Sequence, residues 1–397
     1  MNADQFAATT AKLVPSGYRL RLPGPTTVPE RVRQALALPL VSHRGPEFRH
    51  VLADCMSKLR PVIGTRADIF FIGGSGTAGM EAALVNVLAP DDPVLVVNCG
   101  QFGERFVSIG RELGADVDQV EVAWGEAPDP AALAARLKAK RYRAVACVHN
   151  ESSTGVVTDI AAIGALLAGT DTLLIVDSVS GLGGIAMRMD EWGVDILVAA
   201  SQKCLMCPPG LVVMAVSEKA MAVIEKAATV PRFYFDLRRA KAAGKNGETA
   251  FTPPVSLAYG LREALTMMHE ESVAQVLQRH SRMAAALQAG CIALGLALLP
   301  PPHAISATVT VARVPDGLEG SAIVRQMYAQ YKTVIAGQRT KLHNKVIRLG
   351  TMGAITAPDV LTDLQQLEDT LRSLGQPVRA GAGTQAAAAV LAGAERY

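Results

Sequence analysis

Leu173-Leu-Ile-Val-Asp177 and Asp195-Ile-Leu-Val-Ala-Ala-Ser-Gln-Lys203 are the two stretches that decide the fold of this chain. Each contains a short, continuous apolar run, which is typical of a strand buried on both faces of a sheet. Each ends on a charged side chain. Because ligands bind at the carboxyl ends of strands in such sheets, we expect Asp177 and Lys203 to meet at one ligand-binding edge.

An acid and a lysine at one edge match the two protein groups that pyridoxal phosphate (PLP) needs most. The lysine amine can form a Schiff base with an aldehyde, and the aspartate can keep a pyridinium nitrogen protonated. Taken singly, Asp177 could equally cap a helix, and Lys203 could be a solvated side chain. The apolar setting of Lys203, in Cys204-Leu-Met-Cys-Pro-Pro-Gly210, disfavours the charged amine and so favours a nucleophile or base.

The composition fits an enzyme better than a binding protein for nucleic acid or membranes. The 397 residues suffice for two domains, and 50% are hydrophobic while 19% are charged. The net charge of +3, without a run of Lys or Arg, argues against nucleic acid or an anionic membrane as a partner. The absence of a signal peptide or membrane-length apolar run predicts a cytoplasmic protein with six reduced cysteines. The seven histidines show no metal-ligand spacing, so we expect no metal.

Strand and helix patterns alternate along the chain, which predicts an α/β fold with a mainly parallel sheet covered on both faces. Strands are expected at residues 69–72, 94–97, 144–148, 172–176, 196–199 and 211–216. A long helical pattern then runs from Pro254 to about Leu294, and shorter strand and helix pieces follow it. We expect an N-terminal arm at residues 1–20, a large domain at 21–270 and a smaller C-terminal α/β domain at 271–397.

A glycine-rich turn, Gly73-Gly-Ser-Gly-Thr-Ala-Gly79, follows the first of these strands and opens a helix. Backbone N–H groups at a helix N-terminus bind phosphate, so we expect the PLP phosphate near Gly76 and Thr77. The turn also matches the dinucleotide fingerprint GxGxxG of an NAD-dependent dehydrogenase. That alternative requires an acid at the end of the next strand, where this chain has Asn98.

Four further residues have both a functional and a structural interpretation. Phe102 follows the second strand and could stack on a cofactor ring or belong to the core. Arg348, inside the apolar Val346-Ile-Arg-Leu-Gly350, could clamp a substrate α-carboxylate or form a structural salt bridge. His149 and Glu151 lie in a loop at the ligand edge, where either could be catalytic or hold another residue in place.

Taken together, these motifs resemble the class V aminotransferases of PLP fold type I, and are most similar to the alanine/serine–glyoxylate aminotransferases. The resemblance covers about residues 20 to 355, in the same order, and rests on Leu22-Pro-Gly-Pro-Thr26, Ser42-His-Arg-Gly-Pro-Glu-Phe48, Gly74-Ser-Gly-Thr77, His149-Asn-Glu-Ser-Ser-Thr-Gly155, Asp177-Ser-Val-Ser180, Ser201-Gln-Lys203 and Phe251-Thr-Pro-Pro254. It implies a seven-stranded-type sheet in the large domain. It also implies amino transfer from alanine, serine or aspartate to glyoxylate or pyruvate, with ping-pong kinetics.

The resemblance also implies a role for each matching residue at the cofactor. Lys203 would carry PLP and move the Cα proton, Asp177 would pair with the pyridine nitrogen, and Phe102 would stack on the ring. The phosphate would be held by Gly76, Thr77 and Gln202.

Substrate and subunit contacts follow from the same resemblance. Arg348 would bind the α-carboxylate near the Gly24 backbone, and Ser152 would lie by the phenolic oxygen or that carboxylate. Thr252 and Thr249 would reach the phosphate of a partner subunit, which implies a homodimer with shared active sites. Some relatives have a larger side chain at position 77 and an aromatic one near 249, where this chain has threonine.

Other functions remain open to test. A pyridoxamine–pyruvate aminotransferase would share most of the motifs but would use the free vitamer as substrate. A cysteine desulfurase would need an exposed loop thiol, whereas Cys204 and Cys207 adjoin the lysine and Cys291 lies in a helical stretch. The sequence does not choose the amino donor, because the loops that shape its pocket are not placed by pattern alone.

Overall fold

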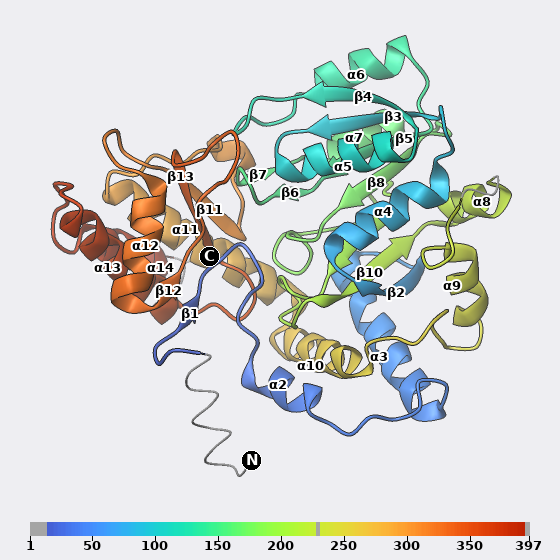
Figure 1. Ribbon diagram of the computed structural model, residues 1–397, viewed down its shortest axis with the longest axis horizontal. Coiled ribbons are helices and arrows are strands. Elements are labelled where there is room, and N and C mark those ends of the chain that lie inside the picture. Colours follow the sequence, from blue (N-terminus) through green and yellow to red (C-terminus); the bar gives the residue numbers. More distant parts are fainter. Residues whose placement is uncertain (1–13, 228–230, 394–397) are drawn as a thin grey trace.

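The computed structural model describes residues 14–227 and 231–393, and its centre is a seven-stranded sheet (Figure 1). The strand order is β2-β10-β9-β8-β5-β3-β4. The bounds are β2 Asp68–Gly74, β3 Pro93–Asn98, β4 Asp116–Glu121, β5 Ala144–Val148, β8 Leu173–Asp177, β9 Ile196–Ala200 and β10 Gly210–Val216. Only β10 runs antiparallel to its neighbours in this sheet, so the expected mainly parallel α/β fold is confirmed.

The register of β8 and β9 brings the two deciding stretches side by side. Asp177 is paired with Val198, and the Ser178 N–H donates to the Val198 carbonyl at 2.8 Å. Since β9 ends at Ala200, Ser201-Gln-Lys203 emerges next to Asp177. The chain therefore carries an acid and a lysine to the same edge of the sheet, as the sequence predicts.

Helices cover both faces of the sheet because successive strand residues point to opposite sides. On β8, Leu174 and Val176 join one core, whereas Leu173 and Ile175 join the other. The first core is covered by α3 (Pro46–Ile63), α6 (Pro130–Ala139), α7 (Ile160–Leu167) and α10 (Val255–Glu271). The second is covered by α4 (Gly76–Val87), α5 (Gln101–Glu112), α8 (Glu218–Lys226) and α9 (Leu237–Gly244).

A separate apolar core, drawn from residues 283–391, lies beside the large sheet (Figure 1). Its antiparallel strands are β11 (Val309–Arg313) and β13 (Val346–Gly350). Its helices are α11 (Val273–Ala293), α12 (Gly320–Tyr331), α13 (Ala357–Ser373) and α14 (Ala382–Gly393). The smaller elements are β1 (Arg19–Leu20), α2 (Glu30–Leu36), β6 (Asn150–Glu151), β7 (Val156–Val157), a 3-10 turn (Pro302–Ala304) and β12 (Thr333–Val334).

The structure differs from the predicted elements at two places. The long helical pattern after Pro254 is two helices, because Ser272 has φ 73° and its hydroxyl accepts a hydrogen bond from the Gln275 N–H at 3.3 Å. Ser272 thus ends α10 and caps α11. The edge strand β4 was missed, because Asp116-Val-Asp-Gln-Val-Glu121 is too polar to look like a buried strand.

The start of the described chain lies against the C-terminal core. β1 pairs in parallel with β12, and Arg19 and Arg21 form ion pairs with Asp363 of α13 at 2.8 and 3.0 Å. Arg21, expected at the start of the large domain, therefore contacts the smaller one. The expected domain boundaries otherwise remain predictions, and residues 1–13 of the expected arm lie outside the described residues. Within the described ranges, no helix is both long and apolar enough to cross a membrane.

Candidate active site

A cavity of about 210 Å³ lies at the carboxyl ends of β8 and β9. Its walls include seven of the predicted site residues, Gly76, Thr77, Phe102, Ser152, Asp177, Gln202 and Lys203. A larger cavity of about 270 Å³, between β2 and α9, contains neither Asp177 nor Lys203. The smaller cavity, where the ionisable pair lies, is therefore the candidate active site.

Lys203 is buried, with 9% of its surface exposed, and its ammonium donates to the carbonyl of Pro23. Burial lowers the pKa of Lys203 to about 8, although the nearby Asp177 carboxylate opposes the shift. A substantial fraction of the amine is therefore neutral near pH 7 to 8. A neutral amine is the form that attacks carbonyl carbons and accepts protons.

Asp177 lies in the same cavity at the end of β8, and only 3% of its surface is exposed. One of its oxygens accepts the Val179 N–H at 2.8 Å. Burial raises the pKa of Asp177 to about 7, while Lys203 and Arg105 act in the opposite direction. A ligand cation beside this carboxyl would favour its charged form, which suits it to hold a protonated ring nitrogen.

The N-terminus of α4 forms one end of the cavity, and the first backbone N–H groups of a helix have no partner inside the helix. A Cβ on Gly76 would lie 2.9 Å from Val179 Cγ2, so only glycine fits at this close approach. Thr77 and Gln202 flank the turn, and the buried Gln202 amide oxygen has no hydrogen-bond partner in the described structure. Rotating that amide by half a turn presents its NH₂ instead. These donors fit a phosphate group at the positive end of the helix.

Phe102 lies in the first turn of α5, and Glu151 holds that turn in place. The Glu151 carboxylate accepts the N–H groups of Phe102 and Gly103 at 2.9 and 3.2 Å. Its other oxygen accepts the N–H and hydroxyl of Ser153. Glu151 is not among the cavity-lining residues and acts as a buried cap for α5, which favours the positioning interpretation.

His149 also lies behind the cavity rather than in its wall. Its Nδ1 lies 2.9 Å from Ser178 Oγ, and its ring packs edge-on against Trp192 with centroids 6.3 Å apart. Burial lowers the pKa of His149 to about 4, so the ring is neutral at physiological pH. This histidine therefore supports the strand end that carries Asp177.

Arg348, on β13, places a largely buried guanidinium beside Ser152. Two of its nitrogens donate to the Gly337 carbonyl at 3.0 and 2.7 Å, and a third donates to the Ser152 carbonyl at 3.0 Å. No carboxylate lies within 4.0 Å of it in the described ranges, so the structural salt bridge is not formed there. Burial lowers the pKa of Arg348 to about 10. Arg348 is not among the cavity-lining residues, but its bond to Ser152 puts this buried cation, which has no salt-bridge partner in the described ranges, behind the cavity wall. A guanidinium there is suited to a substrate carboxylate.

The segment that contains Gly24 passes directly over Lys203. Gly24 has φ 106°, and a Cβ at this position would collide with the end of the Lys203 side chain. The Thr26 N–H donates to the Gln202 carbonyl at 3.0 Å, which fixes this segment to the lysine loop. Position 24 therefore requires glycine for both its backbone conformation and its space.

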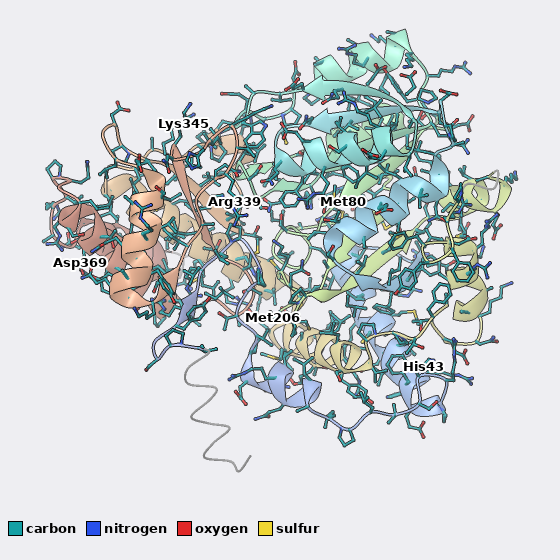
Figure 2. All side chains as sticks on the ribbon, viewed as in Figure 1. His43, Met80, Met206, Arg339, Lys345 and Asp369 are labelled. Atoms are coloured by element: carbon teal, nitrogen blue, oxygen red, sulfur yellow. The ribbon has the colours of Figure 1, made fainter. Side chains whose placement is uncertain are left out.

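Thr249 and Thr252 are not brought to this cavity within one chain. They line the larger cavity instead, and Thr252 Oγ1 lies 3.5 Å from His43 Nε2. His43 lies far from Met80, which lines the smaller cavity (Figure 2). The expected contact of Thr252 with a partner's cofactor remains a prediction.

Sequence reasoning missed Arg105, Asn150 and Val179 in the cavity wall. A signal for Arg105 was present, because it lies three residues after Phe102 and so falls on the same face of a helix. The cysteines of the desulfurase alternative, Cys204, Cys207 and Cys291, are all buried, and burial raises the pKa of each thiol. They do not offer the exposed loop nucleophile that this alternative needs.

Comparisons with known proteins agree with this geometry. The family model "Aminotransferase class-V" matches residues 30–360. The chain is 37% identical to an L-aspartate–glyoxylate aminotransferase of Paracoccus denitrificans, covering 92% of this chain and 94% of that protein. The ureidoglycine–glyoxylate aminotransferase structure from Bacillus subtilis has a TM-score of 0.89 at 32% identity, covering 94% of this chain and 97% of that one.

A pyridoxamine–pyruvate aminotransferase structure from Mesorhizobium loti has a TM-score of 0.90 at 29% identity, covering 95% of this chain and 97% of that one. These matches extend over nearly the whole chain and include the strands, turns and loops that build the cavity. The family-model match covers more than half of the 397 residues. The chain is therefore an aminotransferase and belongs to the class V aminotransferase family.

Proposed function

We propose that this chain is a PLP-dependent aminotransferase that moves an amino group from alanine, serine or aspartate to glyoxylate or pyruvate. The observation that carries the proposal is that the buried Asp177 and Lys203 line one cavity, which ends at the N-terminus of α4. An amine, an acid and a phosphate site in one cavity match the aldehyde, the ring nitrogen and the phosphate of PLP. When bound there, PLP would supply an electron sink for deprotonation at an amino acid Cα.

Each residue of the cavity would have its own role in the reaction. Lys203, whose burial favours the neutral amine, would hold the cofactor and carry the proton to and from Cα. Asp177 would keep the ring nitrogen protonated, while Phe102 would support the ring face. The phosphate would be held by Gly76, Thr77 and Gln202. Because both substrates would use one cavity in turn, ping-pong kinetics are expected.

Substrate binding would rest on Arg348 at the side of the cavity nearest Ser152. Its guanidinium donates to two backbone carbonyls and has no carboxylate partner in the described structure. A substrate α-carboxylate would supply that anionic partner. Ser152 and the backbone at Gly24 would lie next to that carboxylate. The relative from Paracoccus denitrificans is an aspartate–glyoxylate enzyme, which supports glyoxylate as the acceptor.

We propose that the active unit is a homodimer with shared sites. Thr249 and Thr252 lie outside the cavity of their own chain, so their expected contacts with PLP phosphate require a second copy. We also propose the large domain of residues 21–270 and the small domain from 271 as the working division. The break between α10 and α11 at Ser272 supports the second boundary.

A pyridoxamine–pyruvate aminotransferase is the second candidate, because the structure with that name has a TM-score of 0.90. In such an enzyme the vitamer is a substrate and the phosphate site is not required. The α4 N-terminus and the unpaired Gln202 amide favour a bound phosphate here.

The cofactor proposal is tested by the absorption spectrum and by replacing the lysine. Purified protein incubated with PLP is expected to show a visible band that borohydride removes, and Lys203→Ala should lose both the band and turnover. Lys138→Ala, an exposed lysine on α6, is the matched control and should keep both. Protein that gains no band with PLP, or retained turnover in Lys203→Ala, would contradict the proposal.

The substrates are tested by a donor and acceptor panel. Alanine is offered with glyoxylate, while serine, aspartate and pyridoxamine are each offered with glyoxylate and with pyruvate, and oxoacid or pyridoxal formation is measured. An α-amino acid as best donor supports the first function. Turnover of pyridoxamine alone would replace it with the second.

A further inference from the structure

Arg105 is the second cation in the wall of the cavity, and none of the sequence motifs assigns a role to it. Lys203 and Arg105 are the only cationic side chains among the described residues that line this cavity. Arg105 lies on α5, half-buried, one turn after Phe102. No carboxylate lies within 4.0 Å of its guanidinium in the ranges that the structure describes. Its guanidinium is therefore not paired in a salt bridge there, although burial raises the pKa of Asp177 and Arg105 lies near enough to that carboxyl to oppose the rise.

The guanidinium of Arg105 contacts two parts of the predicted cofactor site, the phosphate turn and the ring-stacking residue. Its Nη1 donates to Thr77 Oγ1 at 3.0 Å, at the N-terminus of α4. Its central carbon also lies 4.6 Å from the centroid of the Phe102 ring, within the range of a cation–π contact. One side chain therefore joins the phosphate turn on α4 to the ring-stacking residue on α5.

The bond to Thr77 decides where the threonine hydroxyl can point its proton. A hydroxyl has one O–H donor and two acceptor lone pairs. Because Thr77 Oγ1 already accepts from Arg105, its O–H is directed away from the guanidinium and is free to donate to an anion in the cavity. Arg105 cannot accept a hydrogen bond, so it fixes this donor direction, whereas a hydroxyl partner could also accept from Thr77.

The charge balance of the cavity also supports a role for Arg105 at the phosphate. A phosphate monoester carries about −1.5 to −2 charges at pH 7, and a helix N-terminus supplies only about half a positive charge. Lys203 would be committed to the carbonyl end of the cofactor. Arg105 is then the remaining cation of this wall beside the phosphate turn.

We propose that Arg105 is a positioning and charge-supplying residue for the phosphate end of the cofactor, acting through Thr77, and that it also braces the Phe102 ring. The inference rests on the proposed function, since it takes PLP as the ligand. It assigns to one arginine a preference for the phosphorylated cofactor over the free vitamer. It therefore bears directly on the choice between the two candidate functions.

The test compares two ligands that differ only in the phosphate. Apoprotein of wild type, Arg105→Gln and Arg105→Lys is titrated with PLP and with pyridoxal, and dissociation constants are read from the visible band. Arg105→Gln should weaken PLP about 10- to 100-fold, the range for losing a charged hydrogen-bonding partner, while pyridoxal changes less than about 3-fold. Arg105→Lys should recover part of the loss, because it keeps the charge but not the fork geometry.

Two further variants test whether Arg105 acts on the phosphate through Thr77. Arg111→Gln, an exposed arginine on the same helix, is the matched control and should leave both constants unchanged. In a Thr77→Val background, which removes the hydroxyl but keeps the shape, Arg105→Gln should cost less PLP affinity than in wild type.

Each outcome is decisive. Equal weakening of PLP and pyridoxal by Arg105→Gln would mean that Arg105 acts through Phe102 alone and would overturn the phosphate role. Unchanged PLP affinity would overturn the proposal altogether. A wild-type protein that binds no PLP would instead refute the proposed function, so the two failures are distinguishable.

Discussion

The backbone of Gly24 and the side chain of Lys203 occupy adjoining space at the centre of the candidate site. Lys203 must move between the cofactor carbonyl and a substrate proton, so the space around its amine decides its reach. Burial favours its neutral amine, and the Pro23 carbonyl above it is a hydrogen-bond acceptor. At the scale of single residues, the site therefore depends as much on the missing side chain at position 24 as on the lysine.

Gly24→Ala is expected to lower kcat by at least ~100-fold, because an added Cβ would push the lysine amine out of place by an ångström or more. The folded state should suffer less, because the colliding atoms belong to the flexible end of a side chain. Backbone strain at φ 106° should cost about 1 to 3 kcal/mol of unfolding free energy. Steady-state kinetics and urea unfolding measure the two effects.

Gly17→Ala provides the matched control for this prediction. Gly17 also has a positive φ, 76°, but a Cβ there would meet nothing within 4 Å. The control should show a comparable strain cost with kcat close to wild type. Equal loss of kcat in both variants would show that strain, not the collision with Lys203, limits catalysis.

Helix α5 shows how a buried acid can position a site residue without itself lining the cavity. Glu151 accepts four hydrogen bonds, two of them from the first turn of α5. Those N–H groups have no partner inside the helix, so the carboxylate accepts their hydrogen bonds. Its negative charge also interacts favourably with the positive end of the helix dipole. The direction of the Phe102 ring follows from this cap.

Glu151→Gln is expected to lower the free energy of unfolding by about 1 to 3 kcal/mol, because an amide NH₂ would face an N–H donor and leave it unpaired. The variant should also weaken PLP and pyridoxal binding to the same extent, since it displaces Phe102 but not the phosphate turn. Urea unfolding and ligand titration measure these changes. Glu112→Gln, at an exposed position in the last turn of α5, should change stability by less than about 0.5 kcal/mol. A Glu151→Gln protein as stable as wild type would refute the capping role.

The elements also show which parts of the site could be predicted from the sequence. Six of the seven sheet strands were identified because they are buried on both faces and consist of apolar runs. β4 was missed because an edge strand half-exposed to water can alternate Asp, Gln and Val. The helix break at Ser272 was missed because one positive φ interrupts a pattern that otherwise continues unchanged.

Within the site, residues that follow strands were predictable and those that depend on helix packing were not. Asp177 and Lys203 follow directly from strand ends in a parallel sheet. Arg105 reaches Thr77 only because α4 and α5 lie side by side, and no periodicity in either segment indicates that contact. The cap by Glu151 could not be predicted either, because Phe102 and Gly103, whose N–H groups it accepts, lie about 50 residues away in the chain.

At the scale of the whole molecule, two groups of predicted site residues lie in different cavities of one chain. Lys203 and Asp177 line one cavity, whereas Thr249 and Thr252 line another between β2 and α9. Thr252 is exposed beside His43, which lies at the outer edge of the molecule (Figure 2). If each active site takes its threonines from the other subunit, defects in the two groups should complement each other in a mixed dimer.

Mixing Lys203→Ala with a Thr249→Ala, Thr252→Ala chain is therefore expected to restore activity. A heterodimer of these chains has one site with both defects and one intact site, so it should show about half the turnover of wild type. The two chains are co-expressed with different tags, the heterodimer is purified by sequential capture, and transamination is measured. The matched control pairs Lys203→Ala with a chain carrying all three substitutions, and it should remain inactive because no intact site forms. A heterodimer no more active than the mean of its two parent homodimers would show that each chain completes its own site.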